Sequence, residues 1–232
     1  RWESLLSNKW LFSLYYPNLG GAVPKTYGLL HPINGISLDG RPLRTREDFL
    51  SWLKAIRPPS LVVKPLGGNK GQGVHLIRQV LWMDSDTPRF LTIDGRELEW
   101  AELFDSLGSG QYRGLDGYIL QDWVAPHSEI QRLTGGAPYS LRVVTALRSD
   151  GQAEVQLAAL RIGSLGARVD AWSQGGLAAA VDVSTGQIGS AATRIQFGAE
   201  VVHRHPDTGA QLTGTVVPCW DQVKIATTEI AR

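Results

Sequence analysis

Residues 61–76 read LVVKPLGGNKGQGVHL and are the most informative part of the sequence. Four glycines fall within the seven positions 67–73, so the backbone amides of this segment can approach phosphate oxygens with no Cβ atom in the way. The residues on both sides are largely β-branched and apolar, which predicts strands at 60–66 and 74–78. Lys64 lies on the first of these strands, where its ammonium group can bind phosphate as a compact point charge. The sequence therefore predicts a phosphate-binding loop between two strands.

Two common phosphate-binding loops do not fit this segment. A dinucleotide-binding fingerprint starting at Gly71 needs a glycine at position 76, where the chain has Leu76, and a helix should follow it. A Walker loop needs Gly-Lys-Ser/Thr leading into a helix, and the segment lacks that pattern as well. The remaining alternative is a flexible hairpin with a solvated lysine.

The composition is that of an ordinary globular protein. The chain has 232 residues, enough for one large domain or two small ones, and 43% apolar with 19% charged residues argues against disorder. Lys and Arg number 23 against 22 for Asp and Glu, so we expect no nucleic-acid partner. The apolar runs are far shorter than the roughly 18 residues of a membrane span, and the first residues do not resemble a signal peptide, so we expect no membrane partner. Cys219 is the single cysteine, which indicates a reducing, cytoplasmic location and excludes a Cys-type zinc site.

Turn residues separate short β-branched and aromatic runs, a pattern typical of a strand-rich α+β protein. Thr45 and Asp48 can cap a helix that Pro58 ends. Further helices are expected at 3–16, at 99–107 and from residue 221. Besides the strands around the loop, strands are expected at 118–124, 139–148, 153–162, 177–183 and 213–217. The hairpin signals Asp150-Gly151 and Thr185-Gly186 indicate that much of the sheet is antiparallel.

Several short segments occur in a recognisable order along nearly the whole chain. In the first half they are Asn8-Lys9, Pro24-Lys25-Thr26, the glycine-rich loop behind Lys64-Pro65, and the strand at 118–124. In the second half they are SLRVVT at 140–145, ALRIG at 159–163, QGGL at 174–177, VDVSTG at 181–186 and HPDTG at 205–209. Together these segments resemble the ATP-grasp superfamily, and within it the sugar-transfer-associated ATP-grasp branch.

The resemblance implies an α+β ATP-grasp fold, with two α+β subdomains whose largely antiparallel sheets grip ATP between them. The implied segments are an N-terminal helical segment at 1–19, a lid subdomain with the glycine-rich loop at 20–124, and a C-terminal subdomain at 125–232 that lacks its last strand. The resemblance also implies ATP contacts from eight residues, of which the last three meet the adenine: Lys9, Lys64, Gly68, Gly71, Gly73, Gln121, Asp122 and Val124.

Two arginines are the candidate catalytic residues. If Asp150-Gly151 forms a two-residue turn, Arg142 lies opposite Ala159 and diagonal to Arg161, so both guanidinium groups share one face of the sheet. Two cations there can bind a triphosphate or a carboxylate. The alternative is that they reach the sheet edge or pair with an acid such as Asp170. The resemblance points to the anion, because ATP-grasp enzymes use cations on this sheet to hold the γ-phosphate and the acyl phosphate.

The resemblance implies a Mg²⁺- and ATP-dependent carboxylate–amine ligase that works through an acyl phosphate. Its further partners are a small-molecule or peptide carboxylate and an amine, neither identified by the sequence. Two alternatives remain, a kinase on the same fold and a non-catalytic nucleotide-binding module.

The expected metal site is the main departure from the ATP-grasp pattern. Relatives end with a strand whose acid-x-Asn motif holds magnesium, and no such strand follows the helix expected from residue 221. Asp182 is the candidate metal ligand that remains. His203, His205 and Asp207 surround a strong turn signal and are interpreted as turn residues, not as a metal cluster.

Overall fold

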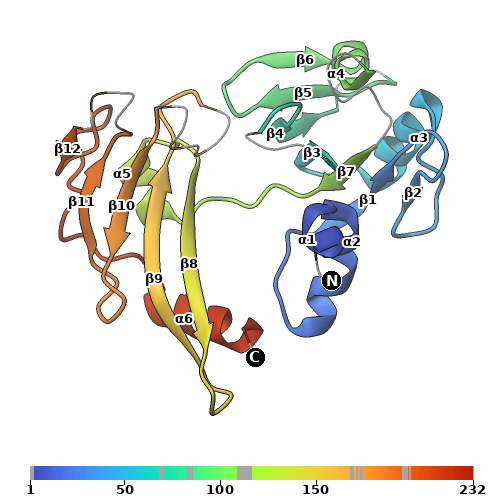
Figure 1. The fold of residues 1–232 in the computed structure, drawn as a ribbon. Coiled ribbons are helices and arrows are strands. Elements are labelled where there is room, and N and C mark those ends of the chain that lie inside the picture. The colour runs from blue at the N-terminus through green and yellow to red at the C-terminus, as the bar shows by residue number, and fades with distance from the viewer. Residues whose placement is uncertain are drawn as a thin grey trace. The chain divides into compact units, whose positions relative to one another are not determined.

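The computed structural model describes residues 3–67, 71–82, 86–108, 117–167, 170, 172, 175–194, 198 and 200–231. The chain divides into two compact units, Arg1–Val124 and Ala125–Arg232, called unit 1 and unit 2 (Figure 1). No helix in the described residues is both long and apolar enough to cross a membrane.

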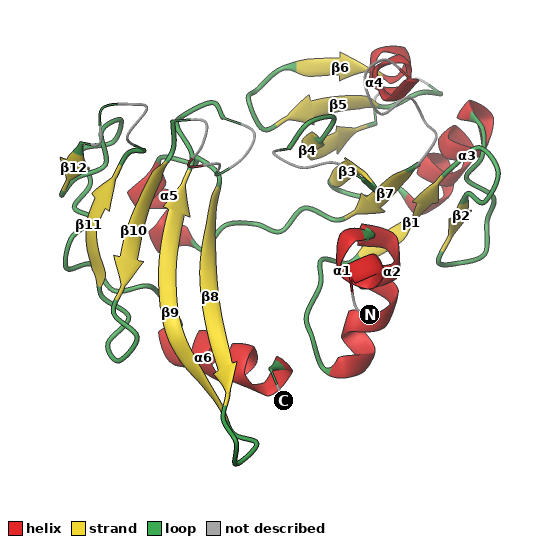
Figure 2. Cartoon of the chain, in the orientation of Figure 1, coloured by secondary structure: helices red, strands yellow, loops and turns green. Residues whose placement is uncertain are grey.

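Unit 1 consists of a seven-stranded antiparallel sheet with helices on both faces (Figure 2). In chain order its elements are α1 (Glu3–Ser7), α2 (Lys9–Tyr15), the 3₁₀ helix η1 (Tyr16–Leu19), β1 (Thr26–Leu30), β2 (Ile36–Ser37), α3 (Arg46–Ile56), β3 (Leu61–Pro65), β4 (His75–Leu81), β5 (Arg89–Thr92), β6 (Glu97–Glu99), α4 (Trp100–Gly108) and β7 (Tyr118–Gln121). The strand order is β2-β1-β7-β3-β4-β5-β6, which places β3, the strand of Lys64, in the middle of the sheet.

Helix α3 begins where the sequence predicts, and its buried side chains belong to the main core of unit 1. Thr45 Oγ1 accepts a hydrogen bond from the Asp48 amide at 3.1 Å, and the Asp48 carboxylate accepts one from the Thr45 amide at 3.2 Å, which satisfies two amides at the helix start. The helix buries Phe49 and Trp52, whose rings stack with their centroids 5.9 Å apart. It ends at Arg57, which takes a left-handed conformation before Pro58.

Unit 2 is a five-stranded antiparallel sheet with two helices on one face. In chain order its elements are α5 (Ser128–Thr134), β8 (Tyr139–Leu147), β9 (Ala153–Ile162), β10 (Leu177–Val181), β11 (Ile188–Ala192), β12 (Val201–Val202) and α6 (Trp220–Ile230), and the strand order is β12-β11-β10-β9-β8. Ile130 of α5 and Trp220 of α6 join one apolar core with Leu160 and Ile162 of β9. Figure 1 shows both helices behind this sheet. The other face, which carries no helix of unit 2, is called the open face.

The β8–β9 hairpin differs from the prediction in its turn but not in its register. The Arg148 amide donates to Gln152 O and the Gly151 amide to Arg148 O, so three residues form the turn and the expected two-residue turn is wrong. A bulge between Val144 and Thr145 then shifts the pairing by one residue. Because the two changes cancel, Arg142 lies opposite Ala159 as expected.

Three further expectations on the elements are corrected by the structure. The helix expected at 3–16 is interrupted at Asn8, whose side chain accepts hydrogen bonds from the amides of Trp10 and Leu11 and so starts a new helix. The segment 213–217 is not a strand, because Gly214 (φ 86°) turns the chain and the segment contributes an isolated bridge, Gln187 with Val216. The short strands β1, β2, β5, β6, β11 and β12 and helix α5 were not expected.

We expect Thr45→Ala to destabilise unit 1 by about 1 kcal/mol, because the Asp48 amide loses its cap. Chemical denaturation followed by circular dichroism measures the change. Ser51→Ala, at an exposed position of the same helix, is the control and should leave stability within about 0.5 kcal/mol. Equal stability of all three proteins would show that the cap contributes nothing.

Candidate functional site

The central strands of unit 1 place Lys64 on the face of the sheet opposite α3 and α4. Lys64 pairs with Ile119 of β7, and Gln121, two residues along, pairs with Val62 and Thr26 on the neighbouring strands. Lys64 Nζ donates to Gln121 Oε1 at 3.2 Å, and Gln121 Nε2 donates to Thr26 Oγ1 at 3.1 Å. The buried Gln121 side chain is thereby fixed, and it holds the lysine ammonium at the sheet surface.

Lys9 reaches the same region from the N-terminal helices. Trp10, the next residue, packs against Leu29, Leu66 and Ile119 on this face of the sheet. Lys9 Nζ donates to Leu66 O at 3.0 Å and to Gly67 O at 3.5 Å, at the point where the glycine-rich loop begins. The two lysines predicted to contact ATP therefore lie at the entrance of the predicted phosphate loop.

The surroundings of both ammonium groups disfavour their charged state. Burial lowers the pKa of the Lys64 ammonium, and the positive charge of Lys9 lowers it further. The pKa of Lys9 is lowered by burial. A polyanion bound beside both amines would reverse these shifts, since an opposite charge favours the protonated form. The region is therefore electrostatically suited to phosphate.

The glycine-rich loop needs glycine at two described positions. Gly71 and Gly73 have φ angles of 71° and 67°, in the left-handed region that side chains rarely adopt. A Cβ atom on Gly73 would also lie 3.0 Å from Pro65 Cγ. Gly68, the third predicted contact of the loop, lies outside the described residues. The backbone geometry explains the two described glycines without reference to a ligand.

The predicted adenine contacts at the end of β7 are not equivalent. The Asp122 carboxylate accepts hydrogen bonds from Ser60 Oγ at 2.5 Å and from the Trp123 amide at 2.9 Å. Burial, and then the charge and hydrogen bond of Asp122, raise the pKa of Tyr27 to about 12. The Asp122 side chain is thus already engaged in hydrogen bonds within the protein. Val124 is exposed, and its role at the adenine stays a prediction.

In unit 2 the two candidate arginines share the open face of the sheet but differ in their partners. Arg161 lies opposite Ser140, and both side chains contact Asp170: Arg161 Nε is 3.7 Å from Asp170 Oδ2, Arg161 Nη2 donates to Asp170 O at 3.2 Å, and Ser140 Oγ donates to the carboxylate. Arg142 is exposed, and within the described residues it has no ion pair or hydrogen bond. Arg142 is therefore the arginine available to an anion.

The candidate metal ligand Asp182 is used by a turn. Its Oδ1 atom accepts hydrogen bonds from the amides and hydroxyl groups of Ser184 and Thr185. These bonds, the Ser184 hydroxyl first, lower the pKa of the exposed carboxyl to about 2. No group of three His, Cys, Asp or Glu side chains that could hold a metal occurs in the part of the chain that the structure describes. Asp182 therefore stays a predicted metal ligand whose carboxylate also serves the turn.

Of the two histidines near the turn at 206–209, His205 makes a hydrogen bond within the turn and His203 lies near hydroxyl groups of neighbouring segments. His203 Nδ1 lies 3.1 Å from the hydroxyl groups of Ser190 and Thr213, and His205 Nδ1 accepts from the Asp207 amide at 3.2 Å. His205 is buried, and its Nε2 has no partner among the described groups. Burial lowers the His205 pKa although Asp207 opposes the shift.

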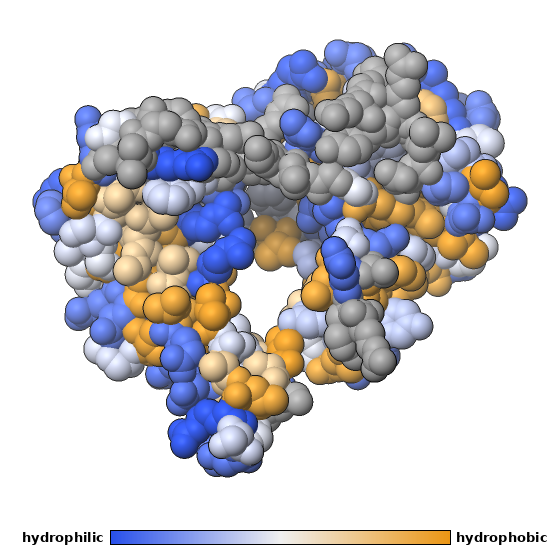
Figure 3. Space-filling model, viewed as in Figure 1, coloured by the Kyte–Doolittle hydropathy of each residue, from blue (hydrophilic) through white to orange (hydrophobic). Residues whose placement is uncertain are grey.

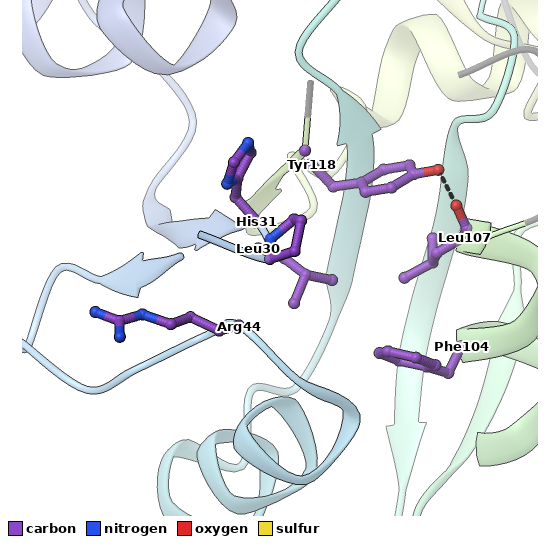
Figure 4. A pocket seen from close by; sticks show the side chains of 8 residues that line it. Leu30, His31, Arg44, Phe104, Leu107 and Tyr118 are labelled. Atoms are coloured by element: carbon purple, nitrogen blue, oxygen red, sulfur yellow. Dashed lines mark hydrogen bonds between the residues drawn. The ribbon is translucent and has the colours of Figure 1, made fainter. Parts of the chain in front are cut away.

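A cavity of about 200 Å³ lies in unit 1 on the α4 side of the sheet, away from Lys64. Its wall is mainly apolar, with Leu30, Phe104 and Leu107 (Figure 4). Tyr118 donates its hydroxyl hydrogen to Leu107 O, and Arg44 points its guanidinium group away from Phe104. The residues that line the cavity do not include Lys9, Lys64 or the described glycines of the loop, so the cavity is separate from the predicted phosphate site.

A sheet with a central lysine before a glycine-rich loop, joined to a second antiparallel sheet with arginines on its open face, defines the ATP-grasp class. The family model for sugar-transfer associated ATP-grasp proteins matches residues 2–232. The chain therefore belongs to this family, whose members share an α+β fold that binds ATP, typically with Mg²⁺. Neither a curated protein nor a solved structure matches the chain significantly.

The sequence did not single out two polar side chains that the structure adds. Ser140 binds Asp170 beside Arg161, and the strand register could have found it, because it lies directly opposite Arg161. Trp172 donates from Nε1 to Ala192 O at 3.0 Å, and no local pattern predicts this contact.

We expect Lys64→Ala to weaken ATP binding by about tenfold or more, because an ammonium group next to phosphate is lost. Calorimetric titration with ATP measures the affinity. Lys54→Ala removes an exposed lysine of α3 and serves as the matched control. Unchanged affinity of Lys64→Ala would remove Lys64 from the nucleotide site.

We expect acid to destabilise the protein through His205. Its pKa is lower in the folded than in the unfolded chain, so the unfolded chain binds more protons as the pH falls below about 7. The free energy of unfolding should therefore drop between pH 7.5 and pH 5.5, as chemical denaturation at about these pH values measures it.

His205→Asn keeps an acceptor for the Asp207 amide but does not titrate, so its stability should change less over the same pH range. The control is His203→Asn, which removes an exposed histidine of the same region. An equal pH dependence in wild type and His205→Asn would contradict the assignment.

Proposed function

We propose that the protein is an ATP-dependent ligase that activates a carboxylate by phosphoryl transfer and joins it to an amine. The observation that carries this proposal is the pair of amines, Lys9 and Lys64, at the entrance of the glycine-rich loop. The pKa values of both amines are lowered, and Lys64 is held by Gln121. A polyphosphate bound beside them would supply the negative charge that stabilises both protonated amines. The proposed subdomains are 20–124 and 125–232, preceded by the helical segment 1–19.

In the proposed reaction, a carboxylate oxygen attacks the γ-phosphorus of ATP. The bond from the γ-phosphorus to the bridging oxygen breaks, and ADP leaves with the electron pair. The amine nitrogen then attacks the acyl carbon, phosphate leaves, and the nitrogen loses a proton to solvent. Lys9 and Lys64 would offset the charge of the phosphates, while Arg142 would bind the carboxylate and then the transferred phosphoryl group.

The described residues also favour one competing function. Because the candidate metal ligand Asp182 is engaged by a turn, a nucleotide-binding module without turnover is the second candidate. A kinase would differ in chemistry: a hydroxyl oxygen would attack the γ-phosphorus, and the product would be a stable phosphoester. Both alternatives predict normal ATP binding, so only the fate of the γ-phosphate separates them from the ligase.

The decisive experiment traps the acyl phosphate. With ATP, Mg²⁺, hydroxylamine and a panel of small carboxylates and peptides, the ligase should form a hydroxamate and release ADP and phosphate in equal amounts. Arg142→Gln should lower the rate by about tenfold or more, because an uncompensated cation next to the anion is removed. Arg148→Gln, at the tip of the same hairpin, is the matched control.

Two results would contradict the ligase. ADP release with a phosphorylated product that hydroxylamine does not cleave would identify a kinase. ATP binding without ADP release under any of these conditions would identify the non-catalytic module.

A further inference from the structure

The open face of the unit 2 sheet has a floor of small side chains. Ala159 of β9 lies opposite Ala180 of β10, and Ala178 lies opposite Arg161 and Ala192. On this side of the sheet, Figure 3 shows apolar residues in tan and orange beside hydrophilic residues in blue. A flat molecule can approach such a floor closely, because alanine methyl groups project little from the sheet.

Two described residues of the stretch between β9 and β10, Asp170 and Trp172, are anchored to the backbone or side chains of this sheet. Asp170 is anchored to Ser140 of β8 and to Arg161 of β9. Two residues later, the indole nitrogen of Trp172 donates to Ala192 O on β11. The anchors lie on the first and the fourth strand from the β8 edge, so residues 170 and 172 span the width of the floor.

Trp172 combines a fixed ring with an exposed surface. Its single polar atom is satisfied by Ala192 O, yet 39% of the residue remains accessible to solvent. Most of the buried aromatic residues of the chain belong to the core of unit 1, where they pack against one another. A rigid, half-exposed indole is suited to stacking, since little side-chain freedom is lost when a ring covers it.

The charged side chains on this face determine whether an anionic or a cationic ligand is favoured. Asp170 compensates Arg161, whereas Arg142 has no compensating group among the described residues. The net positive charge favours an anion and disfavours a cationic ring on the indole. The backbones of β8 and β11 are three strand spacings apart, about 14 Å, so the Arg142 and Trp172 side chains must extend toward each other to meet one ligand. A ligand that meets both must carry its anionic group and its ring on one small framework.

We propose that Trp172 is the stacking platform for the ring of the carboxylate substrate whose carboxylate is bound by Arg142. The substrate class is a carboxylic acid attached to a six-membered ring with an apolar face, which an aromatic acid and a sugar acid both provide. This inference rests on the proposed ligase function for the use of the carboxylate, but binding itself does not require ATP.

The test is calorimetric titration of the nucleotide-free protein with benzoate, glucuronate and acetate. Wild type should bind at least one ring acid about tenfold more tightly than acetate. Trp172→Leu should abolish this difference, Trp172→Phe should retain part of it, and Arg142→Gln should weaken every acid. Tyr15→Leu, an exposed aromatic residue of unit 1, is the control. Preference for benzoate or for glucuronate identifies the source of the ring.

The proposal is overturned if both ring acids bind no better than acetate. It is also overturned if Trp172→Leu leaves the preference unchanged, or if it lowers the affinity for acetate as much as for the ring acids, which would indicate a structural role. A circular dichroism melting curve confirms that each variant is folded.

The experiments distinguish a failure of the stacking proposal from a failure of the ligase proposal. Ring binding that depends on Trp172, without hydroxamate from any carboxylate, would support the platform and contradict the ligase. Hydroxamate formed from a ring acid at the same rate in wild type and in Trp172→Leu would support the ligase and contradict the platform.

Discussion

A half-buried ammonium group needs a hydrogen-bond acceptor, and three adjacent strands together position the acceptor of Lys64. Gln121 on β7 accepts from Lys64 on β3 and donates to Thr26 on β1, so the position of the charge depends on the pairing of all three strands. Helix α2 can bring a second amine close to this charge only because Trp10 packs on the same face. The phosphate site proposed for unit 1 would thus depend on the sheet as much as on the loop.

Features determined by neighbouring residues were predictable from the sequence. The cap of α3 uses Thr45 and Asp48, three residues apart, and the glycine-rich loop lies between two strands that its composition indicates. The β8–β9 turn was assigned the wrong length, because Asp150-Gly151 is compatible with two-residue and three-residue connections. The compensating bulge depends on how the whole pair of strands twists, and no local motif encodes it.

The candidate site was predictable in its residue types and less so in its contacts. Lys64 and the two arginines follow from strand patterns, but Lys9 and Leu66 are 57 positions apart in the sequence, and only the fold brings them together. Asp170 shows the same limit: its pairing with Arg161 was one of two open alternatives until the structure placed it there. Asp182 stays a predicted metal ligand, and its turn bonds were not foreseen, because a carboxylate that follows a strand can serve a turn as well as a metal.

The bulge between Val144 and Thr145 also makes the pairing register of the hairpin tip independent of the register in the rest of β8. A change of one residue in a strand normally turns every later side chain to the opposite face. Here an extra residue in β9 has absorbed such a change between the tip and Arg142. The tip can therefore gain or lose length independently of the open face, and a family built on this hairpin can vary its outermost turn while the arginine keeps its orientation.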